Sequence, residues 1–231
     1  MTGLVLAASH GTSSPEGQAA VRRLVERVAD SLPVRVVGCH VDVEQPDVPT
    51  ALGQSSNEVD HATIVPLLLS AGYHVFVDLA ESADASPVPT TVAPALGPDP
   101  RLAAVLAQRL TEAGLRPDDS IVLAAAGSTD TRAVGDCERM GELLGSHLGR
   151  PVSVGFISAA APRLADAVSA ARSRNPGRRV LIATYLLAPG YFASLAGQAG
   201  GDVVTAPLLT AEHTPLELVE IVMARAVLAT A

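Results

Sequence analysis

Two histidines directly follow apolar segments that are typical of buried strands. His10 follows residues 4–9 (LVLAAS), and His74 comes shortly after residues 64–69 (IVPLLL). In open α/β sheets, ligands bind beyond the carboxyl ends of the strands, and adjacent strands lie about 4.8 Å apart. With strands in the order 2-1-3-4, the two imidazoles converge. Neutral imidazole binds divalent first-row metals and titrates near neutral pH, so this pair predicts a metal site or a proton acceptor.

Two carboxylates follow another predicted strand. The segment HVDVEQP, residues 40–46, contains Asp42 and Glu44. Alternation along a strand places both on one face, so we expect at least one to point into the same site. The alternative is that they are solvated or cap the helix predicted after Pro46. The remaining histidines fit structural roles better: His40, His61, His147 and His213.

The sequence contains an internal repeat. Residues 4–12 (LVLAASHGT) match residues 120–128 (SIVLAAAGS), an offset of 116, and residues 67–75 (LLLSAGYHV) match 185–193 (YLLAPGYFA), an offset of 118. The loop glycines persist in both copies, whereas the reactive side chains do not. The counterparts of His10, His74, Asp42 and Glu44 are Ala126, Phe192, Ser158 and Ala160. The predicted chemistry therefore belongs to the first copy.

Each copy predicts strand, helix, strand, helix, strand, long loop, strand and helix. Short Val/Ile/Leu/Ala runs are typical of parallel strands covered on both faces, and right-handed crossovers then give a doubly wound sheet. The helix expected over 15–30 has Ser13 or Ser14 as its N-cap and Pro15 at its start. We therefore expect an α/β fold of two similar doubly wound parallel-sheet halves with flavodoxin-like topology, residues 1–115 and 116–231, facing a central cleft.

Composition excludes several classes of function. The net charge is −8, which is unsuited to general nucleic-acid binding, and all 16 basic residues are arginine, which excludes lysine Schiff bases and Walker lysines. No apolar run is long enough to cross a membrane, and the N-terminus lacks the features of a signal peptide. With only two cysteines, in unrelated contexts, we expect a cytoplasmic protein that handles a small ligand.

The motifs SHGTSSPEG (residues 9–17) and LLLSAGYHVFVDL (residues 67–79) resemble those of the sirohydrochlorin chelatases of the CbiX type, which are related in fold to the class II chelatases. The resemblance covers nearly the whole chain. It implies a lyase that inserts Fe²⁺ or Co²⁺ into sirohydrochlorin without ATP, for sirohaem or cobalamin biosynthesis. The metal is then a substrate, no organic cofactor is permanently bound, and a duplicated chain can build both walls of the site as a monomer.

The resemblance implies that His10 and His74 hold the metal and that Asp42 takes an acidic position where glutamate is expected. The histidines then present the metal or take the pyrrole protons, and Asp42 or Glu44 receives protons or orients a histidine. The arginine-aspartate pair expected after His-Gly is missing, and Arg132 is a candidate replacement; its alternative role is a solvated surface arginine. The other candidate tetrapyrrole-binding residues are Gly11, Thr12, Ser13, Ser70, Ala71, Gly72, Tyr73, Gly127, Ser128, Gly190, Tyr191 and Phe192.

Two other functions are compatible with these residues. A non-catalytic metal or tetrapyrrole carrier of the same fold would bind without accelerating metalation. A zinc-dependent hydrolase would use two histidines and a carboxylate, and would retain its metal through purification.

Overall fold

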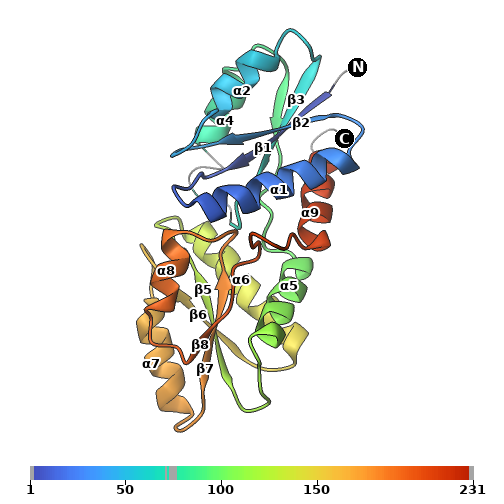
Figure 1. Ribbon diagram of the computed structural model, residues 1–231. Helices are drawn as coiled ribbons and strands as arrows, with labels where there is room; N and C mark the ends of the chain where they lie inside the picture. Colours follow the sequence, from blue (N-terminus) through green and yellow to red (C-terminus); the bar gives the residue numbers. More distant parts are fainter. Residues whose placement is uncertain (1–2, 71, 73–76, 229–231) are drawn as a thin grey trace.

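The computed structural model describes residues 3–70, 72 and 77–228, and these form two parallel sheets of four strands (Figure 1). The first sheet has the order β2-β1-β3-β4, and the second has the order β6-β5-β7-β8. The strands are β1 (Gly3–Ser9), β2 (Arg35–His40), β3 (His61–Pro66), β4 (Thr90–Val92), β5 (Ser120–Ala125), β6 (Val152–Phe156), β7 (Val180–Tyr185) and β8 (Val203–Val204). The predicted strand order and the similarity of the two halves are confirmed.

Helices cover both faces of each sheet because alternate strand residues are apolar on both sides. Leu4, Leu6 and Ala8 of β1 pack under α2 (Val48–Ser55) and α4 (Asp78–Asp84). In the second half, α7 (Leu164–Arg174) and α8 (Tyr191–Gly197) cover the corresponding outer face. None of the helices in the described part of the chain has the length and apolar composition needed to span a bilayer.

The helix α1 (Pro15–Ser31) forms as its sequence predicts. Ser14 is the N-cap, and its hydroxyl accepts a hydrogen bond from the amide of Gly17, while Pro15 starts the helix. Ala20, Val21, Leu24 and Val28 are buried, at the spacing of three and four that gives one apolar face. This helix directly follows the loop that carries His10, so its cap fixes one side of that loop.

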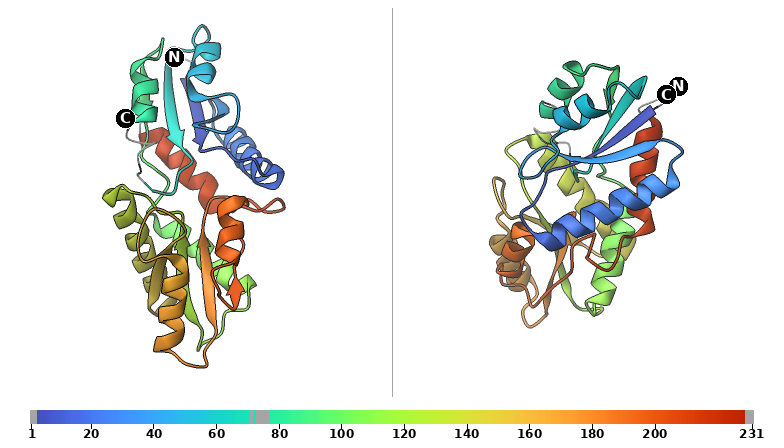
Figure 2. Two further views of the ribbon diagram at one scale, coloured as in Figure 1. Left: turned by 90° about the vertical axis from the view of Figure 1, so that its left-hand side faces the viewer. Right: turned by 45° about the horizontal axis from the view of Figure 1, so that its top comes forward.

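The last helix of each half packs against the other half. Helix α5 (Pro100–Glu112) lies on β7 and on α6 (Thr131–Leu148), whereas α9 (Leu216–Leu228) lies on β3 and α1. The left view of Figure 2 shows α9, in red, between the two halves. The inner faces of both sheets and these four helices share one hydrophobic core. The two halves therefore bury their inner faces against each other through an exchange of helices.

Two equivalent arginines fix the exchanged helices. Arg109 of α5 donates from Nε and Nη2 to the carbonyl oxygens of Pro207 and Leu208, at 3.1 and 2.9 Å. Arg225 of α9 lies 116 positions later and donates from the same atoms to the carbonyl oxygens of residues 95–96, at 2.9 and 3.1 Å. Each arginine thus holds the loop that follows the last strand of the sheet its helix covers.

A tyrosine makes a further link between the halves. Tyr185, at the end of β7, is buried, and its hydroxyl donates to the carbonyl oxygen of Leu69 at 2.7 Å. A Cβ at Gly97 would overlap this hydroxyl, so glycine is needed there. Burial raises the pKa of Tyr185 well above its ordinary value, which keeps the donor protonated. The second half therefore holds the segment that leads toward His74.

The substitution Arg109→Met is expected to lower the free energy of unfolding by about 2–4 kcal/mol. The carbonyl oxygens of Pro207 and Leu208 would lose their donor, at a cost of roughly 1–3 kcal/mol for each buried polar group left unsatisfied. The control is Arg139→Met, because Arg139 is an exposed arginine paired with Glu142 on one helix, where about 0.5 kcal/mol or less is expected. Urea unfolding followed by circular dichroism measures the change in the free energy of unfolding for each variant. Equal changes in Arg109→Met and Arg139→Met would contradict the role given to Arg109.

Candidate metal and tetrapyrrole site

The loop after β1 requires glycine at position 11. His10 is exposed, and its carbonyl oxygen accepts a hydrogen bond from the amide of Asp42 at 3.0 Å. Gly11 has φ +92°, and a Cβ there would collide with the carbonyl oxygen of Asp42. Gly127 in the second half has φ +91° and the same close approach to the carbonyl of Ser158. The repeat thus preserves one backbone turn, which presents His10 in the first half.

The two carboxylates do not share a strand face as alternation predicts. Strand β2 ends at His40, and Val43 has φ +64°, a conformation that is unfavourable for a β-branched residue. The chain turns at Val43, so the carboxylates of Asp42 and Glu44 have different partners. Asp42 is exposed, and its Oδ1 accepts from the amide of Val43 at 2.7 Å. Glu44 is largely buried, and its Oε1 accepts from the amide of Thr12 at 2.8 Å.

Candidate binding residues of the two halves lie next to each other. A Cβ placed on Gly190 would be 3.2 Å from the hydroxyl oxygen of Thr12, and one on Gly72 would be 3.8 Å from that of Ser128. The carbonyl of Pro189 also packs against Gly17, at the start of α1. The carboxyl-end loops of both sheets therefore meet at one contact between the halves, where the site was predicted.

Several predicted residues have positions that bear on their roles. His74, Ala71 and Tyr73 lie outside the described residues, so the pairing of His74 with His10 stays a prediction. Tyr191 and Phe192 begin α8 with exposed rings whose centroids are 6.1 Å apart. Ser13, another predicted binding residue, is exposed.

Arg132 is paired within its own helix. Its Nη2 lies 2.8 Å from a carboxylate oxygen of Asp130, the N-cap of α6, and its Nε also donates to that carboxylate. These hydrogen bonds hold the pKa of the Asp130 carboxyl below its ordinary value. Arg132 is exposed, and its binding of substrate carboxylates stays a prediction.

The cysteines are not available as metal ligands. Cys39 and Cys137 are both buried, and burial raises the pKa of each thiol to about 12. The thiolate that binds metal is therefore scarce at neutral pH. The Ser70 side chain acts in the opposite direction on the pKa of Cys137, lowering it, and so lies beside that thiol of the other half. Among residues 3–70, 72 and 77–228, no group of three or more His, Cys, Asp or Glu side chains is placed to hold an ion.

His40 has polar contacts near the His10 loop that could not be predicted from the sequence. The sequence predicts a structural role for it in a strand, whereas its Nδ1 lies 2.8 Å from the hydroxyl of Ser9 and 3.8 Å from Oε1 of Glu44. Two features of the sequence could have indicated a role for His40: it lies four positions before Glu44, and Phe156 takes its place in the second copy. Neither feature indicates a contact with Ser9, which is 31 positions away.

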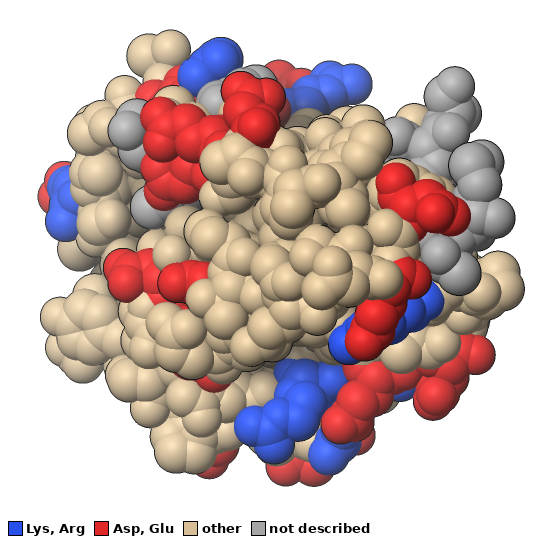
Figure 3. All heavy atoms as spheres, turned by 90° about the horizontal axis from the view of Figure 1, so that it is seen from above, with Lys and Arg blue, Asp and Glu red and all other residues tan. Residues whose placement is uncertain are grey.

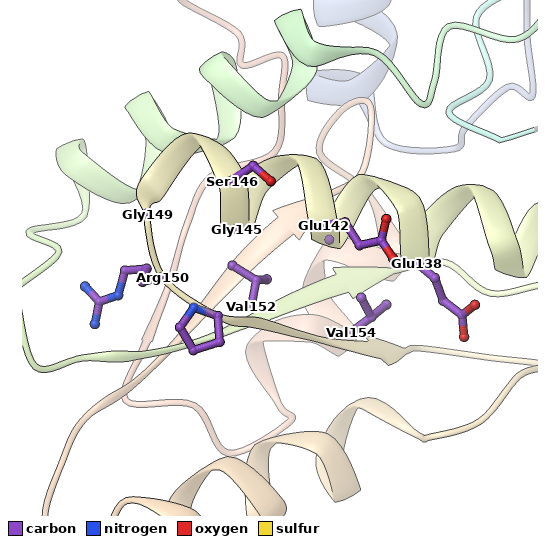
Figure 4. Close-up of a pocket in the computed structure, with 10 residues that line it drawn as sticks. Glu138, Glu142, Gly145, Ser146, Gly149, Arg150, Val152 and Val154 are labelled. Atoms are coloured by element: carbon purple, nitrogen blue, oxygen red, sulfur yellow. The ribbon is translucent and has the colours of Figure 1, made fainter.

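The hollows on the second half lie away from this loop. One of about 700 Å³ runs between α6 and the edge strand β6, with Glu138 and Glu142 on the helix and Val152 and Val154 on the strand (Figure 4). Another of about 230 Å³ lies at the amino ends of the second sheet, around Ser120. Open parallel sheets bind ligands at their carboxyl ends, so neither hollow coincides with the predicted site.

Charge on the first half is mixed. Figure 3 looks down on this half and shows acidic groups and arginines separated by broad uncharged areas. Among the described residues on this face, the arginines occur singly or in small groups, unlike the extended basic surface that phosphate backbones require.

The family of the chain follows from a comparison with protein-family models. The CbiX model matches residues 4–113 and 120–212. The chain belongs to the CbiX family. The CbiX model matches each half once, in agreement with the internal repeat and with the two similar sheets.

Solved structures share the CbiX fold over the whole chain. SirB from Bacillus subtilis with Fe³⁺ has a TM-score of 0.83 at 18% identity, covering 100% of this chain and 96% of that one. SirB from Bacillus subtilis subspecies spizizenii in complex with cobalt has a TM-score of 0.75 at 15% identity, covering 98% and 94%. CbiX, described as the terminal enzyme of sirohaem biosynthesis in denitrifying bacteria, has a TM-score of 0.69 at 24% identity, covering 97% and 99%. A comparison with the curated proteins finds no match.

Gly11→Ala is expected to lower the free energy of unfolding by about 2 kcal/mol or more. The left-handed conformation alone costs a residue with a side chain roughly 1–2 kcal/mol, and overlap with the Asp42 carbonyl adds to this. Gly135→Ala is the control, because a Cβ there meets nothing within 4 Å and a helical alanine is favoured by about 1 kcal/mol. Measured by urea unfolding, the free energy of unfolding should fall in Gly11→Ala and rise in Gly135→Ala. A Gly11→Ala protein as stable as the wild type would contradict this loop geometry.

Proposed function

We propose that this CbiX-family chain is a sirohydrochlorin chelatase that inserts Fe²⁺ or Co²⁺ into the macrocycle without ATP, in sirohaem or cobalamin biosynthesis. The observation that carries the proposal is the exposed His10 on a glycine turn of a family fold, in a loop whose Thr12 lies against Gly190 of the other half. The activity belongs to the lyase class. It uses the metal as a substrate and needs no permanently bound organic cofactor.

The reaction needs few protein ligands. Metalation removes water from the ion, offers the ion to four pyrrole nitrogens and takes two N–H protons from them. A structural zinc site uses about four protein ligands and does not release its ion. His10 together with His74 forms an incomplete shell, so the metal can be transferred. The two imidazoles present the metal or accept the pyrrole protons, and the exposed Asp42 carboxylate receives protons beside His10.

The second half supplies the opposite wall. Gly190 lies against Thr12, and the exposed rings of Tyr191 and Phe192 follow directly, giving apolar surface for a flat macrocycle. Ser128 lies against Gly72 on the other side. Because one chain contributes both walls, the protein can work as a monomer. We place it in the cytoplasm and expect no nucleic-acid or membrane partner.

His10→Ala is expected to reduce metal insertion by about 10²-fold or more, the scale on which a single acid–base group acts. The assay follows the absorbance of sirohydrochlorin with Fe²⁺ or Co²⁺ in parallel, against a reaction without protein. His147→Ala is the control, since His147 is exposed in the last turn of α6, and its rate should match the wild type.

Two outcomes of this assay would contradict different parts of the proposal. No acceleration by the wild type with either metal would contradict the chelatase activity and favour a carrier. Full activity of His10→Ala would contradict the assignment of the site while leaving the activity in place.

A further inference from the structure

A chain of polar contacts lies beside the loop that carries His10. The Ser9 hydroxyl and His40 Nδ1 are 2.8 Å apart, and His40 Nδ1 is 3.8 Å from Glu44 Oε1. The same Glu44 oxygen accepts the amide N–H of Thr12 at 2.8 Å. The side chains of His40 and Glu44 are only 15% and 17% exposed. Ser9 and Thr12, the residues on either side of His10 and Gly11, are therefore both held by this pair.

The second half builds the same turn without these contacts. The positions of Ser9, His40 and Glu44 are taken by Ala125, Phe156 and Ala160. The backbone is nevertheless alike: Ser158 donates to Ala126 at 2.9 Å, as Asp42 donates to His10 at 3.0 Å. The two turn glycines also have φ values within one degree, +91° and +92°. The polar contacts are thus not needed to form the turn, and they occur only where the turn carries a histidine.

Thr12 connects these contacts to the second half. Its hydroxyl oxygen lies beside Gly190, and its carbonyl oxygen accepts from the side-chain amide of Gln18 at 2.8 Å. A displacement of the Thr12 backbone would therefore shift the His10 loop against the opposite wall. The Glu44 carboxylate restrains that backbone through a charge-assisted hydrogen bond, which is stronger than a neutral one.

We propose that His40 and Glu44 are positioning residues that hold residues 9–12 in one conformation and so fix the imidazole of His10 against the second half. This inference rests on the proposed chelatase function. Glu44 then acts as a hydrogen-bond acceptor for Thr12, and Asp42 is the carboxylate left to handle protons. Contacts of this kind behind a metal-site histidine orient it, and their loss typically costs about 10–100-fold in activity or metal affinity.

The repeat itself supplies the test substitutions. His40→Phe and Glu44→Ala introduce the residues that the second half carries in the same turn, so both variants are expected to fold. Glu44→Gln keeps an oxygen that can accept from the Thr12 amide but removes the charge. Glu58→Ala is the control, because Glu58 is an exposed carboxylate of the same half, paired with Arg35.

Glu44→Ala and His40→Phe are expected to lower kcat for metal insertion by about 10–100-fold, with KM for the tetrapyrrole within about twofold of wild type. Glu44→Gln should recover most of the rate that Glu44→Ala loses, and Glu58→Ala should match the wild type. Hydrogen exchange of the Thr12 amide, measured by NMR, should be faster in Glu44→Ala than in Glu44→Gln. This readout tests positioning even if the wild type inserts no metal.

Two results would overturn the inference. If Glu44→Gln is as slow as Glu44→Ala while the Thr12 amide stays protected in both, the carboxylate acts through its charge. If Glu44→Ala and His40→Phe have wild-type kcat and wild-type exchange at Thr12, the pair positions nothing.

Discussion

The exchange of helices between the halves is the constraint on which the site depends. Each sheet is completed by a helix from the other half, and Arg109 and Arg225 each bind the carbonyl oxygens of the loop after the last strand of the sheet their helix covers. The inner faces of both sheets are buried in one core, so neither half can turn away without exposing apolar surface. The two sets of carboxyl-end loops are consequently held against each other, and residues such as Thr12 and Gly190 keep a fixed separation.

Within this symmetric frame the chemistry is asymmetric. The turn at Gly11 and the turn at Gly127 have the same backbone, but only the first presents a histidine and only the first has the contacts of Ser9, His40 and Glu44 beside it. In the second half, the backbone at Gly190 instead lies close to Thr12, and the exposed rings of Tyr191 and Phe192 follow it. In the proposed function, a duplicated fold thereby separates the two requirements of metalation, since one wall would carry groups for the ion and protons and the other wall would accommodate the macrocycle.

Strand order, the start of α1 and the glycine turn could be predicted because each depends on local sequence or on the repeat. The exchange of α5 and α9 could not, since an amphipathic pattern shows that a helix has a buried face but not which sheet covers it. The segment around Val43 reads as an alternating strand, and nothing in its residue types indicates the positive φ that separates Asp42 from Glu44. The contact between His40 and Ser9 was also hidden, because it joins residues from neighbouring strands.

In the proposed site, one wall holds the metal through the imidazoles of His10 and His74. The most direct measurement is the crystal structure of the protein soaked with Co²⁺, with an anomalous difference map recorded at the cobalt edge. We expect the strongest peak at the contact between the halves, marking an ion that both imidazoles coordinate and that is open toward the loop at Gly190. A strongest peak elsewhere, or imidazoles too far apart to share one ion, would contradict it.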